Sequence, residues 1–116
     1  MGIWQEGKLI ALAFARLGTA SGSHSYALRT GAPTAEGTLD FCDVMVDAAW
    51  RRQGIHKAIH QFVMAMAKAN GCHAIYCTVD PANIPSRSSF EHQGYRAICE
   101  KQAYDGRPRV YYQLTL

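Results

Sequence analysis

The sequence predicts one α+β domain, a mixed α/β sandwich in which helices flank a central mixed, mostly antiparallel sheet with a βαβ unit. Three observations predict this class. One hairpin pattern opens the chain, a second closes it, and between them an amphipathic helical segment separates two apolar strand segments. Strands joined through a helix run parallel, whereas hairpin strands run antiparallel. We therefore expect a mixed sheet.

The composition is that of a single globular domain over residues 1–116. Of the 116 residues, 48% are hydrophobic and 18% are charged, and the formal net charge is +3. A domain of this length buries roughly two-thirds of its unfolded surface, so it needs no metal or disulfide staple. The four cysteines form no C-x-x-C pair. This predicts reduced thiols, no metal site and a cytoplasmic location.

Hydropathy and charge exclude two classes of partner. The longest apolar stretch, residues 9–15, is far shorter than the roughly 20 residues that cross a bilayer. We also expect no export, because Glu6 precedes this short stretch, although Ala13-Phe14-Ala15 resembles a signal-peptide cleavage site. The basic residues gather at 51–57 and 107–109, which suits a small anionic ligand better than nucleic acid.

The first third of the chain predicts three strands. Residues 3–5 and 8–17 form a hairpin around Glu6-Gly7, in which glycine supplies the positive φ of the turn. Residues 18–37 are rich in Gly, Ser, Thr and Ala and predict a surface loop with a short strand candidate at 24–29. Residues 39–46 form a strand whose apolar phase slips near Cys42-Asp43, which predicts a bulge.

The middle of the chain predicts an amphipathic helix that ends at Asn70-Gly71. His56 and His60 are one turn apart, but no third metal ligand accompanies them, so we expect them on a polar helix face. The predicted apolar face consists of Ile55, Ala58, Ile59, Phe62, Val63, Met66 and Ala69.

The last third predicts a buried strand at Ala74 to Val79 and a short helix that reaches to about residue 93. Asn83 can cap this helix, Pro85 suits its first turn and Gly94 closes it. Strands 95–104 and 109–116 follow, joined by Asp105-Gly106, a pair favoured in two-residue primed turns. Tyr111 and Tyr112 point to opposite faces of the last strand, and we expect at least one of them in the core.

The segment from Arg51 to His56 is the most informative for chemistry. It lies between a strand and a helix N-terminus, where several amides lack partners and the helix dipole is positive. Gly54 lets a ligand approach the backbone, and Arg51, Arg52 and Lys57 add charge. A diphosphate fits this description; the alternative is a set of solvated charges on an ordinary connection. The segment is not a P-loop, because G-x-x-x-x-G-K-[ST] is absent.

Two spaced motifs resemble those of one family. Arg51, Gly54 and His56 occupy the defined positions of R/Q-x-x-G-x-G/A at the start of the helix. Downstream, an Asn, an aromatic residue seven positions later and a Gly-aromatic pair form the second motif, here Asn83, Phe90, Gly94 and Tyr95. In these residues and in its element order the chain resembles the GNAT superfamily of acyl-CoA N-acyltransferases.

The resemblance implies that acetyl-CoA, as co-substrate and without a metal, lies in a cleft between splayed parallel strands 39–46 and 74–79. It further implies a diphosphate over the amides of residues 53–57, a pantetheine arm bonded to Asn83, and an acyl carbonyl polarised by the main chain of residues 44–46. The cofactor-binding residues that it implies are Val44, Met45, Val46, Arg51, Arg52, Gln53, Gly54, Ile55, His56, Lys57, Asn83, Ser86 and Phe90.

Direct transfer from a thioester to an amine needs a base and an acid. Asp43, beside the predicted bulge, is the candidate catalytic base; the alternative is an exposed strand aspartate. Phe90 stands where many family members have a tyrosine, so the acid would be Ser88, Ser89 or water. His56 stands where Gly or Ala is usual. We expect Trp50 to pack against the sheet edge, with stacking on adenine as the alternative.

The predicted function is transfer of an acetyl group from acetyl-CoA to a primary amine of a small molecule or protein. The alternative is a catalytically silent acyl-CoA-binding or regulatory module, which Phe90 favours. In the family a strand and two helices usually precede the opening hairpin, and those helices form one wall of the acceptor site. The sequence as given lacks them before residue 3, so we expect either a true start upstream, or a second subunit or the loop at residues 18–37 over the open flank. A sheet edge left uncovered in this way would allow a homodimer.

Overall fold

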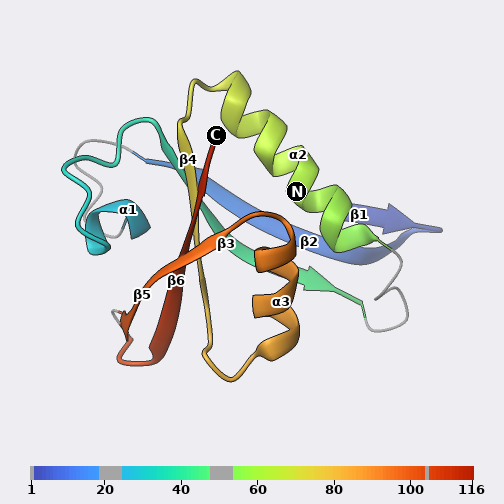
Figure 1. Cartoon of the computed structure of the whole chain (residues 1–116). Helices are drawn as coiled ribbons and strands as arrows, with labels where there is room; N and C mark the ends of the chain where they lie inside the picture. The colour runs from blue at the N-terminus through green and yellow to red at the C-terminus, as the bar shows by residue number, and fades with distance from the viewer. Residues whose placement is uncertain (1, 19–24, 48–53, 104) are drawn as a thin grey trace.

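A computed structural model of the chain describes residues 2–18, 25–47, 54–103 and 105–116, with the backbone alone described at residues 10 and 43–46. One six-stranded sheet has the strand order β1-β2-β3-β4-β6-β5 (Figure 1). Only β3 and β4 run parallel, and the other neighbours are antiparallel. The elements are β1 Gly2–Gln5, β2 Lys8–Leu17, α1 Tyr26–Arg29, β3 Thr38–Val46, α2 Ile55–Ala69, β4 Ala74–Val79, α3 Ile84–His92, β5 Arg96–Gln102 and β6 Pro108–Thr115.

The predicted opening hairpin is confirmed. Gln5 pairs with Lys8, and the two residues between them have positive φ, 50° at Glu6 and 77° at Gly7. Two left-handed residues make a primed turn, whose twist matches that of the strands it joins. The helix α3 is also confirmed: Asn83 Oδ1 accepts a hydrogen bond from the Ser86 amide at 3.3 Å, and Gly94 follows the helix with a φ of 97°.

The closing hairpin has a longer turn than predicted. Ala103 donates its amide hydrogen to the Arg107 carbonyl at 2.8 Å, and Gly106 donates to the Ala103 carbonyl at 2.9 Å. Gly106 has a φ of 81°, but the φ of Asp105 is not positive, so Asp105-Gly106 is not a two-residue primed turn. The Asp105 carboxylate accepts from the Arg107 amide at 3.0 Å. This local bond favours the longer turn.

The short strand expected at residues 24–29 is wrong, because α1 forms there. Ala27 of α1 is fully buried and packs with Ala74 and Tyr76 of β4. The Tyr26 amide, which has no partner within the helix, donates to the Asp40 carboxylate of β3 at 3.2 Å. A one-turn helix has no period to detect, and its stability comes from these two strands.

The two faces of the sheet carry different layers. On one face α2 and α3 cover the main core, which includes Phe41 and Ile75. On the other face α1 covers a smaller cluster, and Figure 1 shows α1 on the side of the sheet away from α2 and α3. Tyr111 and Tyr112 confirm the predicted alternation: Tyr111 meets the Tyr26 ring of α1 at 5.9 Å, and Tyr112 stacks on Phe90 of α3.

Helix α2 has the predicted bounds, but its buried face is rotated from the predicted one. The buried residues are Ile59, His60, Val63 and Ala67. Phe62, expected in the core, is 53% exposed, and His60, expected on a polar face, is 1% exposed. The apolar face of this helix is broad, so the sequence alone is compatible with several rotations of the helix about its axis. Contacts with the sheet and with Tyr95, whose hydroxyl lies 3.3 Å from His60 Nδ1, select the observed one.

Candidate functional site

The parallel strands β3 and β4 separate part-way along their length. They pair only from Thr38–Phe41 with Ala74–Cys77. Beyond Phe41, β3 continues beside β2 to Val46, while β4 continues beside β6 to Val79, and the two strands diverge (Figure 1). Residues 42–46 of β3 therefore have no partner strand on the β4 side within the described chain. The main-chain groups of residues 43–46 on that side can therefore bond to a ligand. The predicted splay of the two parallel strands is confirmed.

A β-bulge lies where the strands begin to part. In the β2–β3 ladder Phe41 pairs with Ala15 and Asp43 pairs with Phe14, so Cys42 is the extra residue of β3. A bulge bends its strand and increases the local twist. The bulge predicted near Cys42-Asp43 is therefore confirmed, and it gives a physical reason for the divergence of β3 from β4.

The N-terminus of α2 follows β3. Gly54 is its N-cap residue, in a left-handed conformation with a φ of 77°, and among the described residues no side chain caps the helix. The first turn holds no acidic residue, so its amides and the positive end of the dipole can attract an anion. A Cβ atom at Gly54 would meet no atom of the described residues within 4 Å. Ile55 is half-buried and Lys57 exposed. The predicted site residues Arg51, Arg52 and Gln53, and also Trp50, lie outside the described residues.

His56 connects the start of α2 with α3. Its Nδ1 lies 3.0 Å from Ser89 Oγ, and its ring contacts the Phe90 ring edge-on with centroids 5.4 Å apart. Burial lowers the pKa of His56, so its neutral form is favoured. His56 was expected on a polar helix face; instead it is half-buried between the two helices. The expectation failed because α3, which supplies both contacts, is remote in sequence.

Phe90 joins a ring cluster. It is 5% exposed and makes edge contacts with Phe41 of β3 at 5.9 Å and with Tyr95 at 5.1 Å. The ring therefore lies next to the position where β3 and β4 part. Ser89, one of the three acids that were left open, faces α2, whereas Ser88 is exposed.

For the remaining predicted site residues, the roles in cofactor binding and catalysis stay predictions. Asn83 and Ser86 lie at the N-terminus of α3, where the bond between them caps the helix. Asp43 is placed by its backbone opposite Phe14, beside the bulge. Its side chain lies outside the described part of the structure, as do the side chains of residues 44–46.

A cavity of about 520 Å³ lies on the opposite face of the sheet at the same position. Cys42 and Thr78, the residues that follow the last parallel pair Phe41–Cys77, contribute to its wall. Burial raises the pKa of the lining residue Tyr26 to about 12, so this phenol is neutral at physiological pH. The lining residues are Arg16, Tyr26, Arg29, Cys42, Thr78, Ala103, Asp105, Arg107, Arg109 and Tyr111.

Sequence reasoning missed most of this cavity. The sequence predicts Arg29 at the end of a short strand within a surface loop, and it marks Arg109 only as a basic residue near Arg107. The single usable signal was the two-residue alternation that places Arg109 on the same face of β6 as Tyr111. No local pattern connects residues 16, 29, 78 and 109, because they come from four separate elements.

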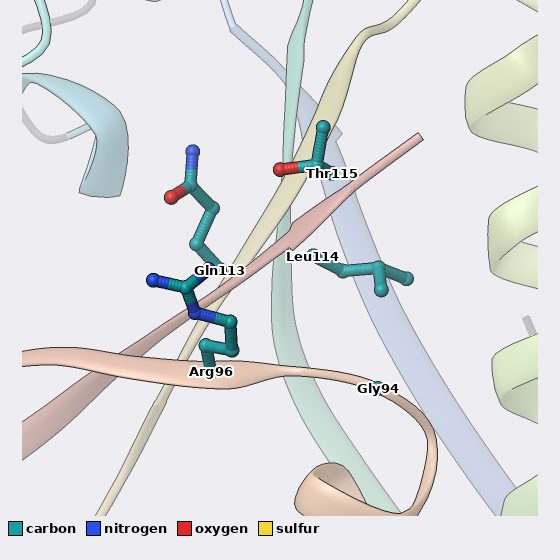
Figure 2. A pocket seen from close by; sticks show the side chains of 5 residues that line it. All are labelled: Gly94, Arg96, Gln113, Leu114 and Thr115. Atoms are coloured by element: carbon teal, nitrogen blue, oxygen red, sulfur yellow. The ribbon is translucent and has the colours of Figure 1, made fainter.

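A smaller cavity of about 240 Å³ lies elsewhere, between the start of β5 and the end of β6. Figure 2 shows Arg96 and Gln113 on one side of the strands and Leu114 on the other. Gln113 donates to the Tyr76 hydroxyl at 3.0 Å. This cavity lies away from the diverging ends of β3 and β4, and of its lining residues only Arg96 is charged.

The described residues show neither a metal-binding cluster nor a membrane-spanning helix. Within residues 2–18, 25–47, 54–103 and 105–116, no three His, Cys, Asp or Glu side chains gather where they could hold a metal ion. Over the same ranges, no helix has the length and apolar character needed to cross a bilayer.

The chain belongs to the Acetyltransferase (GNAT) family, whose sequence pattern matches residues 1–95. It is similar in fold to a GNAT-family protein from Desulfovibrio desulfuricans (TM-score 0.73, 17% identity, covering 97% of this chain and 65% of that one). It is also similar to the ribosomal-protein-S18-alanine N-acetyltransferase from Escherichia coli (0.73, 18%, 98% and 66%). A third match is a Bacillus subtilis acetyltransferase solved in complex with CoA (0.73, 15%, 97% and 73%).

Because these three structures are only 15–18% identical to the chain, their similarity to it shows the fold alone. The chain spans just under two-thirds of the length of the first two matched structures. Among curated protein sequences, none matches this chain. The predicted fold class and the predicted family are both confirmed.

Proposed function

We propose that the chain transfers an acetyl group from acetyl-CoA to a primary amine of a small molecule or protein. The observation that carries the proposal is the divergence of β3 from β4 at the Cys42 bulge, together with the left-handed Gly54 at the start of α2, the next described element in the chain. An unpaired stretch of strand edge is thus followed in the sequence by a helix N-terminus whose N-cap residue has no side chain. The family assignment and the CoA complex of the Bacillus subtilis protein support the same choice of co-substrate.

In this proposal the two features bind different parts of acetyl-CoA. The diphosphate lies over the amides of the first turn of α2, where the helix dipole favours negative charge. The pantetheine arm follows residues 43–46 of β3, whose main-chain groups have no partner in β4 within the described chain. An amide of that edge donates to the thioester carbonyl and stabilises the negative charge that develops on its oxygen.

The reaction is a direct displacement. The nitrogen of the neutral amine attacks the thioester carbonyl carbon, a C–N bond forms, and the C–S bond breaks. The amine loses one proton, which Asp43 accepts in this proposal, and the thiolate gains one. Ser89 or water supplies that second proton, because Phe90 has no hydroxyl.

A second candidate is a CoA-binding module without turnover. Phe90 favours it, because the ring packs in the core where many family members have a tyrosine hydroxyl near the sulfur. The His56–Ser89 contact joins α2 and α3 and would have to leave room for the pantetheine arm. Both candidates predict CoA binding, and only the first predicts product.

The test combines two measurements on the purified protein. Isothermal titration with acetyl-CoA measures binding, and release of the free thiol over a panel of amines measures turnover. Binding with turnover supports the transferase, and binding without turnover for every amine supports the silent module. Absence of CoA binding by the folded protein would overturn both candidates.

A further inference from the structure

The cavity on the α1 face of the sheet is rich in arginine. Four of its ten lining residues are arginines, and Asp105 is the single acidic one. These arginines come from β2, α1, β6 and the turn before β6. A cavity with one sign of charge raises the local concentration of ligands with the opposite sign. The charge that the cavity presents to a ligand depends on which of the four arginines are paired with an acidic side chain.

Two of the arginines have acidic partners. Arg16 Nε lies 2.9 Å from Oδ2 of the buried Asp40, which also accepts the Tyr26 amide. Burial raises the pKa of Asp40, and the bonds from Tyr26 and Arg16 oppose that rise. Arg107 Nε lies 3.8 Å from Oδ2 of Asp105. These two pairs cancel in charge, so they contribute little to the field in the cavity.

Arg29 and Arg109 bond only neutral groups among the described residues. Arg29 donates from Nε to the Tyr111 hydroxyl at 3.0 Å and from a terminal nitrogen to the Gln102 carbonyl at 3.1 Å. Arg109 donates from Nε to the Thr78 hydroxyl at 3.3 Å and from a terminal nitrogen to the Thr78 carbonyl at 3.4 Å. These bonds orient both guanidinium groups without cancelling their charge.

The arrangement leaves each guanidinium able to bind an oxyanion. A guanidinium has five N–H donors, and in the bonds above each arginine donates only from Nε and from one terminal nitrogen. Lys101 adds a further positive charge, because its ammonium group donates to the carbonyl oxygen of Arg29. A planar, oriented guanidinium suits carboxylate and phosphate better than other anions.

The cavity also lies beside the gap between β3 and β4, where an amine acceptor must bind to reach the thioester. Cys42 and Thr78 line it just past the last parallel pair, so it adjoins the gap between β3 and β4. In the proposed function acetyl-CoA approaches that gap from the α2 and α3 face. A second substrate can therefore reach the thioester from the α1 face. A cavity of about 520 Å³ is within the usual range for a small-molecule site.

We propose that this cavity is the acceptor site, and that Arg29 and Arg109 select a small amine that also carries an oxyanion, either a carboxylate or a phosphate. The inference rests on the proposed function. The oxyanion binds the two arginines, and this contact holds the amine nitrogen toward the gap between the strands. Arg29 and Arg109 are thus specificity residues in the substrate site, distinct from the CoA turn.

The test compares amines that differ only in the oxyanion. β-Alanine is matched with β-alaninamide, and 2-aminoethyl phosphate with ethanolamine, in the thiol-release assay with acetyl-CoA. We expect kcat/KM to be higher for the charged member on the order of tenfold or more, as for a hydrogen bond to a charged group. A preference in the phosphate pair alone identifies a phosphorylated amine, and a preference in both pairs identifies a general oxyanion site.

Three variants that each lose one positive charge test whether the preference for the charged amine comes from the cavity. Arg29→Gln and Arg109→Gln should reduce it, whereas Arg96→Gln, an exposed residue of the smaller cavity, should leave it intact. All three should bind CoA like the wild type. Equal kcat/KM within both pairs in the wild type, or an unchanged preference in both cavity variants, overturns the proposal.

A direct binding measurement separates this inference from the proposed function. Inorganic phosphate is titrated into the protein while the Nε–Hε NMR signals of the arginines are followed. Saturable shifts of the Arg29 and Arg109 signals, without a shift at Arg96, support the cavity even if no amine is acetylated. Absence of those shifts overturns the oxyanion site even if CoA binds and amines are acetylated.

Discussion

Replacement of Gly54 by alanine tests the CoA turn with little disturbance to the fold. Gly54 has a φ of +77°, and a left-handed L-residue costs roughly 1–2 kcal/mol. A Cβ atom there would meet no atom of the described part of the chain within 4 Å, so no clash with that part adds to this cost. We therefore expect the free energy of unfolding to fall by roughly 1–2 kcal/mol.

Gly71 provides the matched control at the other end of α2. Its φ is +73° and a Cβ atom there would also meet nothing within 4 Å, so Gly71→Ala should have the same cost in stability. The two variants should differ in binding. In the proposed function the diphosphate approaches through the open space beside Gly54, so Gly54→Ala should weaken CoA binding on the order of tenfold, about 1.4 kcal/mol.

Two measurements check this prediction. Urea unfolding gives the free energy of unfolding of each variant, and isothermal titration gives its affinity for acetyl-CoA. Gly54→Arg should fold and lose more CoA affinity than Gly54→Ala, because its side chain fills the approach. If Gly54→Ala binds acetyl-CoA as tightly as Gly71→Ala does, the N-terminus of α2 does not hold the diphosphate.

Three further outcomes are expected. Burial lowers the pKa values of His56 and His60, so the unfolded chain takes up more protons than the folded chain as the pH falls from 7.5 to 5.5, and the free energy of unfolding decreases. Urea unfolding at both pH values should show this decrease, and His60→Gln should make the free energy of unfolding less dependent on pH. Phe90→Ala should cost about 3–5 kcal/mol of unfolding free energy and Phe90→Leu much less, and a loss below 1 kcal/mol for alanine would refute the core role of the ring. Asp43→Asn should slow acetyl transfer at neutral pH without changing CoA affinity, and a wild-type rate and pH profile would remove Asp43 as the base.

The elements predicted well are those with local determinants. The period of α2, its end at Gly71, the Asn83 cap of α3 and the Glu6-Gly7 turn each depend on residues a few positions apart. The part of the candidate site that we propose for CoA has the same property, because the bulge at Cys42 and the turn at Gly54 belong to consecutive described elements of the chain. Contiguous motifs can be recognised before the fold is known.

The elements predicted poorly depend on remote partners. Helix α1 forms because Asp40 accepts the Tyr26 amide, and no pattern within residues 24–29 contains that bond. His60 is buried because Tyr95 supplies a hydroxyl across α2, although a histidine in a helix predicts a polar face. In each case a hydrogen bond from another element decides the outcome.

The sequence by itself determined the fold class, the family and the position of the α2 turn, because periodicity, caps and spaced motifs are local properties. Only the tertiary structure decided the composition of the cavity that we propose as the acceptor site. Arg16, Arg29, Thr78 and Arg109 meet in one cavity because strand pairing brings β2, β4 and β6 together and α1 packs against them. Strand order is set by contacts between distant segments, so the charge of that cavity emerges only when the chain is folded.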